Sequence, residues 1–178
     1  LAGAEDEGER WNRWLTKSAS VKMLVVAEDP EELGVRTVLN LGHTVGHALE
    51  SASLNEPTNR LLHGEAVALG LAFAIFESKL GILSAQRLNS TGEKEATVIM
   101  SWLKESVPLT VECFPAAEHL WNQMIHDKKN VGNEVRDVAW RGVGNVVWPV
   151  AWEKEVFEAT WNDFVRFWKE QPNVLTTS

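Results

Sequence analysis

One segment, residues 63–80, constrains the fold of this chain more than any other. Its sequence, HGEAVALGLAFAIFESKL, predicts a long helix that is apolar on nearly every side and that ends at Gly81. Such a helix is buried in the middle of a domain, because each apolar side needs a packing partner. The longest apolar run, from Ala66 to Phe76, contains Gly70 and is too short to span a membrane. We therefore predict a central helix in a globular core.

Further helical segments on both sides of this one indicate a mainly α fold. We expect helices over residues 11–27, 36–51, 84–89, 93–105, 116–127 and 153–169. Two β-prone runs, residues 135–140 and 146–150, flank the sequence RGVGN and predict a hairpin. The prediction is one multi-helix domain over residues 1–178 with a small β-hairpin, in which residues 171–178 form a loose tail.

The composition excludes several classes of protein. A formal net charge of −8 argues against general nucleic-acid binding, which needs a basic face. The chain has no run of about twenty apolar residues, and its acidic start, LAGAEDEGER, lacks the pattern of a signal peptide. The single cysteine, Cys113, cannot form an internal disulfide and fits a reducing compartment. We expect a cytoplasmic protein that binds neither nucleic acid nor membranes.

Three of the five histidines lie in one short part of the chain: His43, His47 and His63. His43 and His47 are four residues apart, so they share a helix face. This spacing alone is weak evidence for a metal site, and Thr44 stands where the zinc-protease motif HExxH has its Glu. Gly42 and Gly46 would each cost a helix about 1 kcal/mol relative to Ala. Two glycines at this spacing suggest the close approach of another backbone or of a ligand.

His63 begins the next predicted helix, so two adjacent helices could supply imidazoles to one metal ion. Catalytic zinc usually takes three protein ligands plus a water or substrate molecule. Within this chain, Glu50 or Glu65 could be the third ligand. Glu50 projects toward the face of His43 and His47, and its alternative role is to orient an imidazole ring.

Cationic and amide side chains near the histidines could bind an anionic substrate. Arg36 and Asn40 lie about two turns and one turn before His43 and would continue its helix face. A guanidinium grips planar anions with a fork of donors, and an Asn amide adds a neutral donor. Arg36 could equally pair with Glu32, four residues earlier. Three further cations, each by itself typical of a solvated surface, are Lys22, Lys128 and Lys129.

Two motifs together carry a resemblance to a known family. The string ExGxRxxxNxGHxxGHAxE, from Glu32 to Glu50, is followed by HGEAVAxG, from His63 to Gly70. This combination resembles the 3-dehydroquinate synthase family, the prototype of the sugar-phosphate cyclases. Lys22 and the sequence DKKN at residues 127–130 also fall where that family has matching residues. The resemblance runs from about Trp11 through the predicted hairpin.

The resemblance implies a role for each of these polar residues. His43 and His63 look like two of the three ligands of a zinc ion, or of Co²⁺ in its place. His47 and Glu32 look like the positions that accept protons. The residues that resemble the family's substrate-binding set are Lys22, Arg36, Asn40, His47 and one of Lys128 and Lys129.

The implied reaction converts 3-deoxy-D-arabino-heptulosonate 7-phosphate into 3-dehydroquinate and phosphate, in the shikimate route to aromatic amino acids. The chain departs from the family in having no counterpart of the α/β domain that binds NAD, nor of the upstream Glu that is the third zinc ligand. Gly142-x-Gly144 lacks the third glycine of a dinucleotide site and fits a hairpin turn. The chain therefore resembles the C-terminal helical domain only, and by itself we expect it to be inactive.

Two other functions remain open on these residues. One is another sugar-phosphate cyclase, although a substrate without a carboxylate would have less use for Arg36. The other is a non-catalytic remnant of the fold that acts as a binding module. We also expect the apolar surface left by the absent domain to associate with that domain or with a second copy, as a homodimer.

Overall fold

The computed structural model describes residues 6–54, 60–107, 114–126 and 134–170. The chain forms two compact units, Leu1–Leu39 and Asn40–Ser178. The single domain predicted over residues 1–178 stays a prediction, and the predicted tail lies outside the described residues. None of the helices in the described ranges combines the length and the apolar character that crossing a bilayer requires.

The first unit contains α1, Glu7–Glu28, and most of the 3-10 helix η1, Val35–Asn40. A turn joins them, in which the Asp29 carboxylate accepts three backbone hydrogen bonds. Asp29 Oδ1 accepts from Leu33 N at 3.0 Å, and Oδ2 accepts from Gly34 N at 2.7 Å and Arg36 N at 3.0 Å. Burial raises the pKa of Asp29, but these three N–H groups and the Arg36 charge lower it by more, so its net pKa lies below the usual value.

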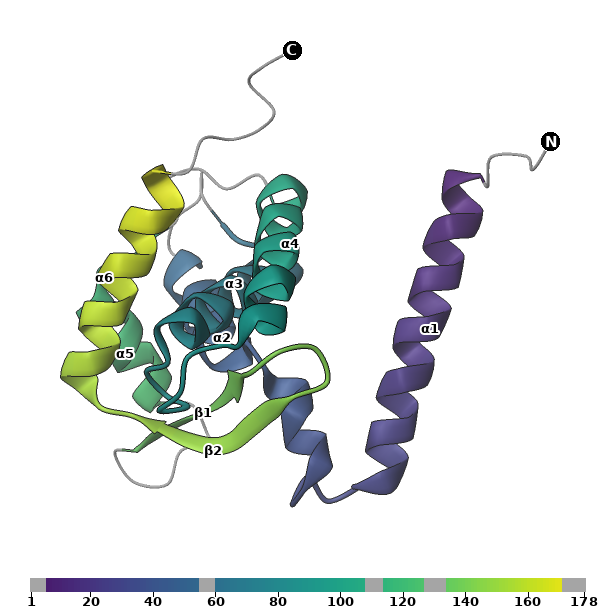
Figure 1. The fold of residues 1–178 in the computed structure, drawn as a ribbon, viewed down its shortest axis with the longest axis horizontal. Coiled ribbons are helices and arrows are strands. Elements are labelled where there is room, and N and C mark those ends of the chain that lie inside the picture. The colour runs from purple at the N-terminus through teal and green to yellow at the C-terminus, as the bar shows by residue number, and fades with distance from the viewer. Residues whose placement is uncertain (1–5, 55–59, 108–113, 127–133, 171–178) are drawn as a thin grey trace, which may run out of the picture. The chain divides into compact units, whose positions relative to one another are not determined.

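The second unit is a layer of helices around α3, His63–Leu80 (Figure 1). α3 contacts α2, His43–Ser53; α4, Ser90–Ser106; and α6, Lys154–Glu170. It has its predicted bounds and its predicted end, because Gly81 adopts a φ of 70° and its N–H closes the last turn on Glu77 O. The predicted burial is confirmed as well, since Leu69, Phe73 and Ile75 are all buried.

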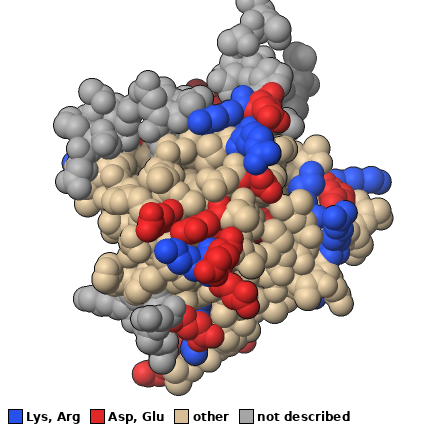
Figure 2. Space-filling view, turned by 90° about the vertical axis from the view of Figure 1, so that its left-hand side faces the viewer, with Lys and Arg blue, Asp and Glu red and all other residues tan. Residues whose placement is uncertain are grey.

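An aromatic cluster forms the centre of the core between α3 and α6. The Phe73 ring packs against four aromatic rings at centroid distances from 5.5 to 5.7 Å: those of Trp152, Phe157, Trp161 and Phe164. Helix α5, Ala117–Ile125, lies beside α6 and adds Trp121 to the cluster. On the face in Figure 2, Lys and Arg lie among Asp and Glu, and α6 itself carries the pairs Lys154–Glu158 and Arg166–Asp163.

Strands β1, Val135–Trp140, and β2, Val146–Trp152, form the predicted antiparallel hairpin. Its turn is closed by Arg141 N donating to Asn145 O at 2.9 Å, and Gly144 adopts a φ of 75° within it. The prediction of a mainly α fold with one small hairpin is therefore confirmed in the described residues.

Two helix predictions were wrong. The helix expected over residues 36–51 is broken into η1 and α2, because Gly42 between them adopts a φ of 74°. Arg36 and Asn40 therefore do not continue the helical face of His43. The helix expected over residues 84–89 is absent from that described stretch, which forms turns that lead into α4. Asn89 instead caps α4, since its Oδ1 accepts from Thr91 N at 3.1 Å and Gly92 N at 2.9 Å.

Candidate metal and substrate site

Three imidazole rings lie together where α2 meets the start of α3. The ring centroids are 5.5 Å apart for His43 and His47, 6.0 Å for His43 and His63, and 5.6 Å for His47 and His63. The spacing of His43 and His47 along one helix brings their rings to the same side. His63 comes from the other helix, so the cluster depends on how α2 packs on α3. We call these three residues the imidazole cluster.

Close backbone contact brings the two helices together. A Cβ atom at Gly70 would lie 1.9 Å from Gly42 O, and one at Gly46 would lie 3.0 Å from Val67 Cα. A side chain of any size at these positions would push α2 and α3 apart. The prediction that the glycines allow close approach of a backbone is thus confirmed, and that backbone is α3.

The two glutamates considered as a third metal ligand have different contacts. Glu50 Oε2 lies 2.9 Å from His63 Nδ1. Glu65 Oε2 accepts from Leu62 N at 2.8 Å and so caps the first turn of α3. Across the described ranges of the chain, no three His, Cys, Asp or Glu side chains are arranged to hold one metal ion.

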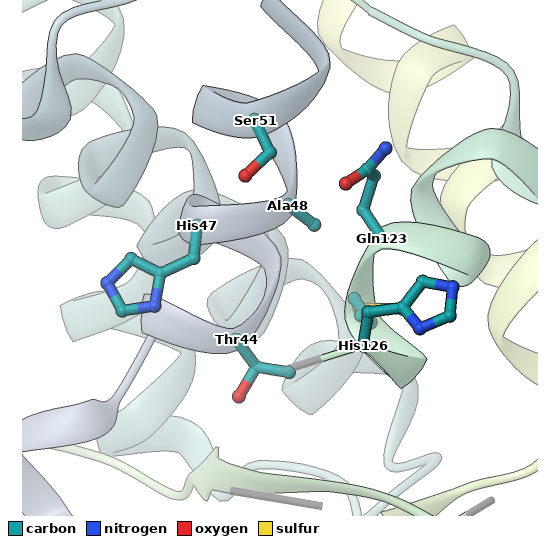
Figure 3. A pocket seen from close by; sticks show the side chains of 7 residues that line it. Thr44, His47, Ala48, Ser51, Gln123 and His126 are labelled. Atoms are coloured by element: carbon teal, nitrogen blue, oxygen red, sulfur yellow. The ribbon is translucent and has the colours of Figure 1, made fainter. Parts of the chain in front are cut away.

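A pocket of about 210 Å³ adjoins the imidazole cluster at His47 (Figure 3). Helix α2 provides Thr44, His47 and Ser51, α5 provides Gln123, and His126 follows directly after α5. Its polar lining groups are hydroxyl, amide and imidazole groups, with no carboxylate among the described residues that line it. Such a lining can donate hydrogen bonds to an oxygen-rich, anionic ligand.

The other predicted site residues differ in exposure and in their contacts. Asn40 is half-buried at the end of η1, and Lys22 is exposed on α1. In the first unit, the Arg36 guanidinium donates to Pro30 O at 2.7 Å and lies 3.6 Å from Glu32 Oε2. The pairing of Arg36 with Glu32, which the sequence left open, is therefore present. Three residues named from the sequence lie outside the described residues: Cys113, Lys128 and Lys129.

Two buried carboxyl groups escaped the sequence analysis. Burial raises the pKa of Glu77, on α3, to about 7, against hydrogen bonds from Leu83 N and Ser78 that lower it. Burial also raises the pKa of Asp137, on β1, which accepts from Val138 N at 2.8 Å and Trp152 Nε1 at 3.1 Å. The available signal was an acidic residue inside each apolar run, AIFESKL and VRDVAW.

The pocket residues on α5 were also missed. His126 directly precedes the DKKN sequence, which was a usable signal. Gln123 and Ser51 carried no signal, because only the packing of α5 on α2 brings them together.

Comparisons with known proteins identify the family of the chain. A family model described as 3-dehydroquinate synthase C-terminal matches residues 3–130. Relatives named 3-dehydroquinate synthase include those of Xanthomonas campestris pv. campestris, 38% identical over 134 residues, and Rhodospirillum rubrum, 41% identical over 152 residues. These alignments cover 73% and 82% of this chain but 34% and 37% of the relatives. The chain thus spans about a third of the length of the curated relatives it matches.

A solved structure shares the fold. It is 2-deoxy-scyllo-inosose synthase complexed with carbaglucose-6-phosphate, NAD⁺ and Co²⁺, with a TM-score of 0.58 and 22% identity. The match covers 81% of this chain and 38% of that chain. With the family model covering residues 3–130 and the relatives above 30% identity, the chain belongs to the 3-dehydroquinate synthase family and matches its C-terminal part.

Proposed function

We propose that this chain is the metal- and substrate-binding part of a 3-dehydroquinate synthase. The whole enzyme would convert 3-deoxy-D-arabino-heptulosonate 7-phosphate into 3-dehydroquinate and phosphate, in the shikimate pathway. The observation that carries the proposal is the imidazole cluster, whose three ring centroids lie within 6.0 Å of one another beside a polar pocket.

The donor set at the cluster fits a divalent metal ion such as Zn²⁺ or Co²⁺. His43 and His63 would hold the ion, because neutral imidazole nitrogens suit both metals. Their Nδ1 atoms contact Leu41 O at 3.2 Å and Glu50 Oε2 at 2.9 Å, which leaves Nε2 as the ligating nitrogen of each ring. A bound ion would supply Lewis acidity toward a hydroxyl or carbonyl oxygen of the substrate.

His47 would take part in proton transfer, which its membership of both the imidazole cluster and the pocket supports. Loss of phosphate from the sugar requires removal of a proton from a neighbouring carbon, and His47 would accept it. The pocket beside His47 suits the phosphate end of the substrate, because its described lining offers donors without a repelling carboxylate.

The remaining predicted residues would bind or activate other parts of the substrate. Arg36 would hold the carboxylate of the heptulosonate, while its pairing with Glu32 orients the guanidinium. Glu32 would also serve as a proton acceptor. The further cations and amide donor in this role are Lys22, Asn40 and one of Lys128 and Lys129.

NAD would be held by a nucleotide-binding domain outside these residues, and the third metal ligand would come from there too. The structural neighbour, a sugar-phosphate cyclase, was solved with NAD⁺, Co²⁺ and a sugar phosphate, which supports this set of partners. For the 178 residues alone we expect little turnover and weak zinc affinity. The homodimer and the cytoplasmic location stay predictions.

The test joins this chain to the nucleotide-binding domain of a relative and measures zinc content and phosphate release. We expect His43→Ala and His63→Ala each to lose most of the bound zinc and to lower kcat by at least about a hundredfold. The matched control is His119→Ala, an exposed histidine on α5, which should keep both. If His43→Ala leaves zinc content and turnover unchanged, the proposed function is wrong.

The main alternative is that the chain belongs to another sugar-phosphate cyclase, because the structural neighbour is a 2-deoxy-scyllo-inosose synthase. Assays with the heptulosonate phosphate and with a sugar phosphate that lacks a carboxylate separate the two. We expect the carboxylated substrate to be preferred and Arg36→Ala to raise its KM. A fusion that binds no zinc and turns over neither substrate would instead indicate a non-catalytic binding module.

A further inference from the structure

One contact at the imidazole cluster joins the two helices directly. His63, the first residue of α3, has its Nδ1 atom 2.9 Å from Oε2 of Glu50, near the end of α2. The His63 side chain is 57% exposed and that of Glu50 is 34% exposed. A contact this short between two partly hydrated side chains requires that the two helix backbones hold them in register.

The glycine contacts provide that register. Gly70 packs so closely on α2 that a Cβ atom there would lie 2.8 Å from Gly46 N. Gly46 lies one turn before Glu50 on α2, and Gly70 lies about two turns after His63 on α3. The carboxylate of Glu50 can therefore span the remaining gap to the ring of His63.

The chemistry of this contact determines which ring nitrogen carries the proton. An ionised carboxylate only accepts hydrogen bonds, so Nδ1 of a neutral His63 must hold the hydrogen and donate it to Glu50. The ring then presents its lone pair at Nε2. An isolated histidine in water prefers the opposite tautomer, with the hydrogen on Nε2.

His43 reaches the same state through a different partner. Its Nδ1 lies 3.2 Å from the backbone oxygen of Leu41, which also only accepts. Both rings therefore present Nε2 as the lone-pair atom, although one is held by the backbone and the other by a side chain. Only the second of these can be removed by a single substitution.

We propose that Glu50 is a positioning residue that fixes the Nδ1–H tautomer and the orientation of His63, so that Nε2 is presented to the site. Glu50 thus acts through His63 and is not itself a metal ligand. The purpose of this arrangement rests on the proposed function, since a metal ion needs a lone pair that is already aimed at it. The tautomer itself exists without any ion.

The test measures the tautomer of each histidine in the 178-residue chain without metal, by long-range ¹H–¹⁵N correlation NMR. The ring ¹⁵N and ¹H shifts distinguish the Nδ1–H, Nε2–H and doubly protonated forms, and the tautomer is read from spectra without the doubly protonated form. In the unaltered chain we expect the Nδ1–H form of His63 to dominate. In Glu50→Ala we expect Nε2–H to become the major form of His63, while His43 keeps Nδ1–H as an internal control.

The matched control is Glu65→Ala, which removes a carboxylate two residues from His63 that contacts Leu62 N instead. It should leave the His63 tautomer unchanged. If His63 in the unaltered chain is mainly Nε2–H, or if Glu50→Ala leaves its tautomer unchanged, the inference is wrong. Failure of the proposed function appears separately, as a zinc-free and inactive fusion whose His63 still holds the Nδ1–H form.

Discussion

The free energy of unfolding should fall between pH 4.5 and about pH 7 as Glu77 ionises, and replacing Glu77 by Gln should abolish this fall. Glu77 is only 1% exposed, and Ser78 Oγ lies 3.0 Å from its Oε1. Ser78 Oγ also contacts the backbone oxygens of Ala74 and Trp140, which can only accept its single proton. Because Ser78 has one proton for three acceptors, its hydrogen bond only partly supports the ionised carboxylate of Glu77, and burial raises the pKa of that group.

The sign and size of the effect follow from the raised pKa. Because the folded state binds the Glu77 proton more tightly than the unfolded state, the contribution of Glu77 to stability is largest below pH 4.5 and falls as pH rises to about 7. At about 1.4 kcal/mol for each tenfold change in proton affinity, the rise from 4.5 to about 7 corresponds to about 3 kcal/mol. A Gln amide can donate to Ser78 and accept from Leu83 N, so it imitates the protonated acid without titrating.

The assay is urea unfolding followed by tryptophan fluorescence at several pH values from about 5 to about 8.5. Relative to the unaltered protein, Glu77→Gln should gain less than about 1 kcal/mol near pH 5 and about 3 kcal/mol above pH 8. The control Glu105→Gln, at an exposed position of α4, should follow the unaltered protein throughout. Parallel curves for Glu77→Gln and the unaltered protein would refute the reasoning, because Glu77 would then titrate alike in both states.

Three further substitutions test a helix contact, a helix cap and the aromatic core. Gly70→Ala should destabilise the fold by more than about 3 kcal/mol in urea unfolding, because its Cβ atom would lie 1.9 Å from Gly42 O. The control Gly64→Ala has open space around the added Cβ atom and should change the stability little. Asn89→Ala should cost about 1 kcal/mol of unfolding free energy and Asn89→Asp much less; equal losses would show that the cap is unimportant. Phe73→Ala should cost about 3–5 kcal/mol and Phe73→Leu less, as measured by thermal unfolding; a loss under about 1 kcal/mol would contradict its central place in the core.

Local patterns predicted most of the helices correctly. The apolar segment of α3 and its glycine stop act within a few residues, so the sequence alone located both ends at His63 and Leu80. The hairpin followed equally from two β-prone runs and a glycine-rich turn. The failures were the helix over residues 84–89 and the continuous helix over residues 36–51. In the second case, Gly42 adopts a left-handed conformation, and a Cβ atom there would lie 2.6 Å from the backbone nitrogen of Leu71, which is distant in sequence.

The sequence predicted the residues of the candidate site but not the contacts between them. Spacing placed His43 and His47 on one helix face, the start of the next predicted helix supplied His63, and the resemblance added the role of each. The sequence left both Glu50 and Glu65 as candidate third ligands, with orientation of an imidazole as the alternative role of Glu50. The structure has Glu50 at the His63 ring and Glu65 at a helix cap. The pocket residues Gln123 and Ser51 could not be paired from the sequence, because they come from helices far apart in the chain.

The sequence by itself determined which segments are helical, which helix is central, and to which family the motifs point, because these depend on neighbouring residues and on residue type. Only the tertiary structure decided which side chains meet across α2 and α3. That packing depends on glycines at which an added Cβ atom would clash with the other segment. At Gly70, for example, the Cβ atom would lie 1.9 Å from Gly42 O. Contacts that short select a single register of the two helices, and the contact between His63 and Glu50 follows from that register.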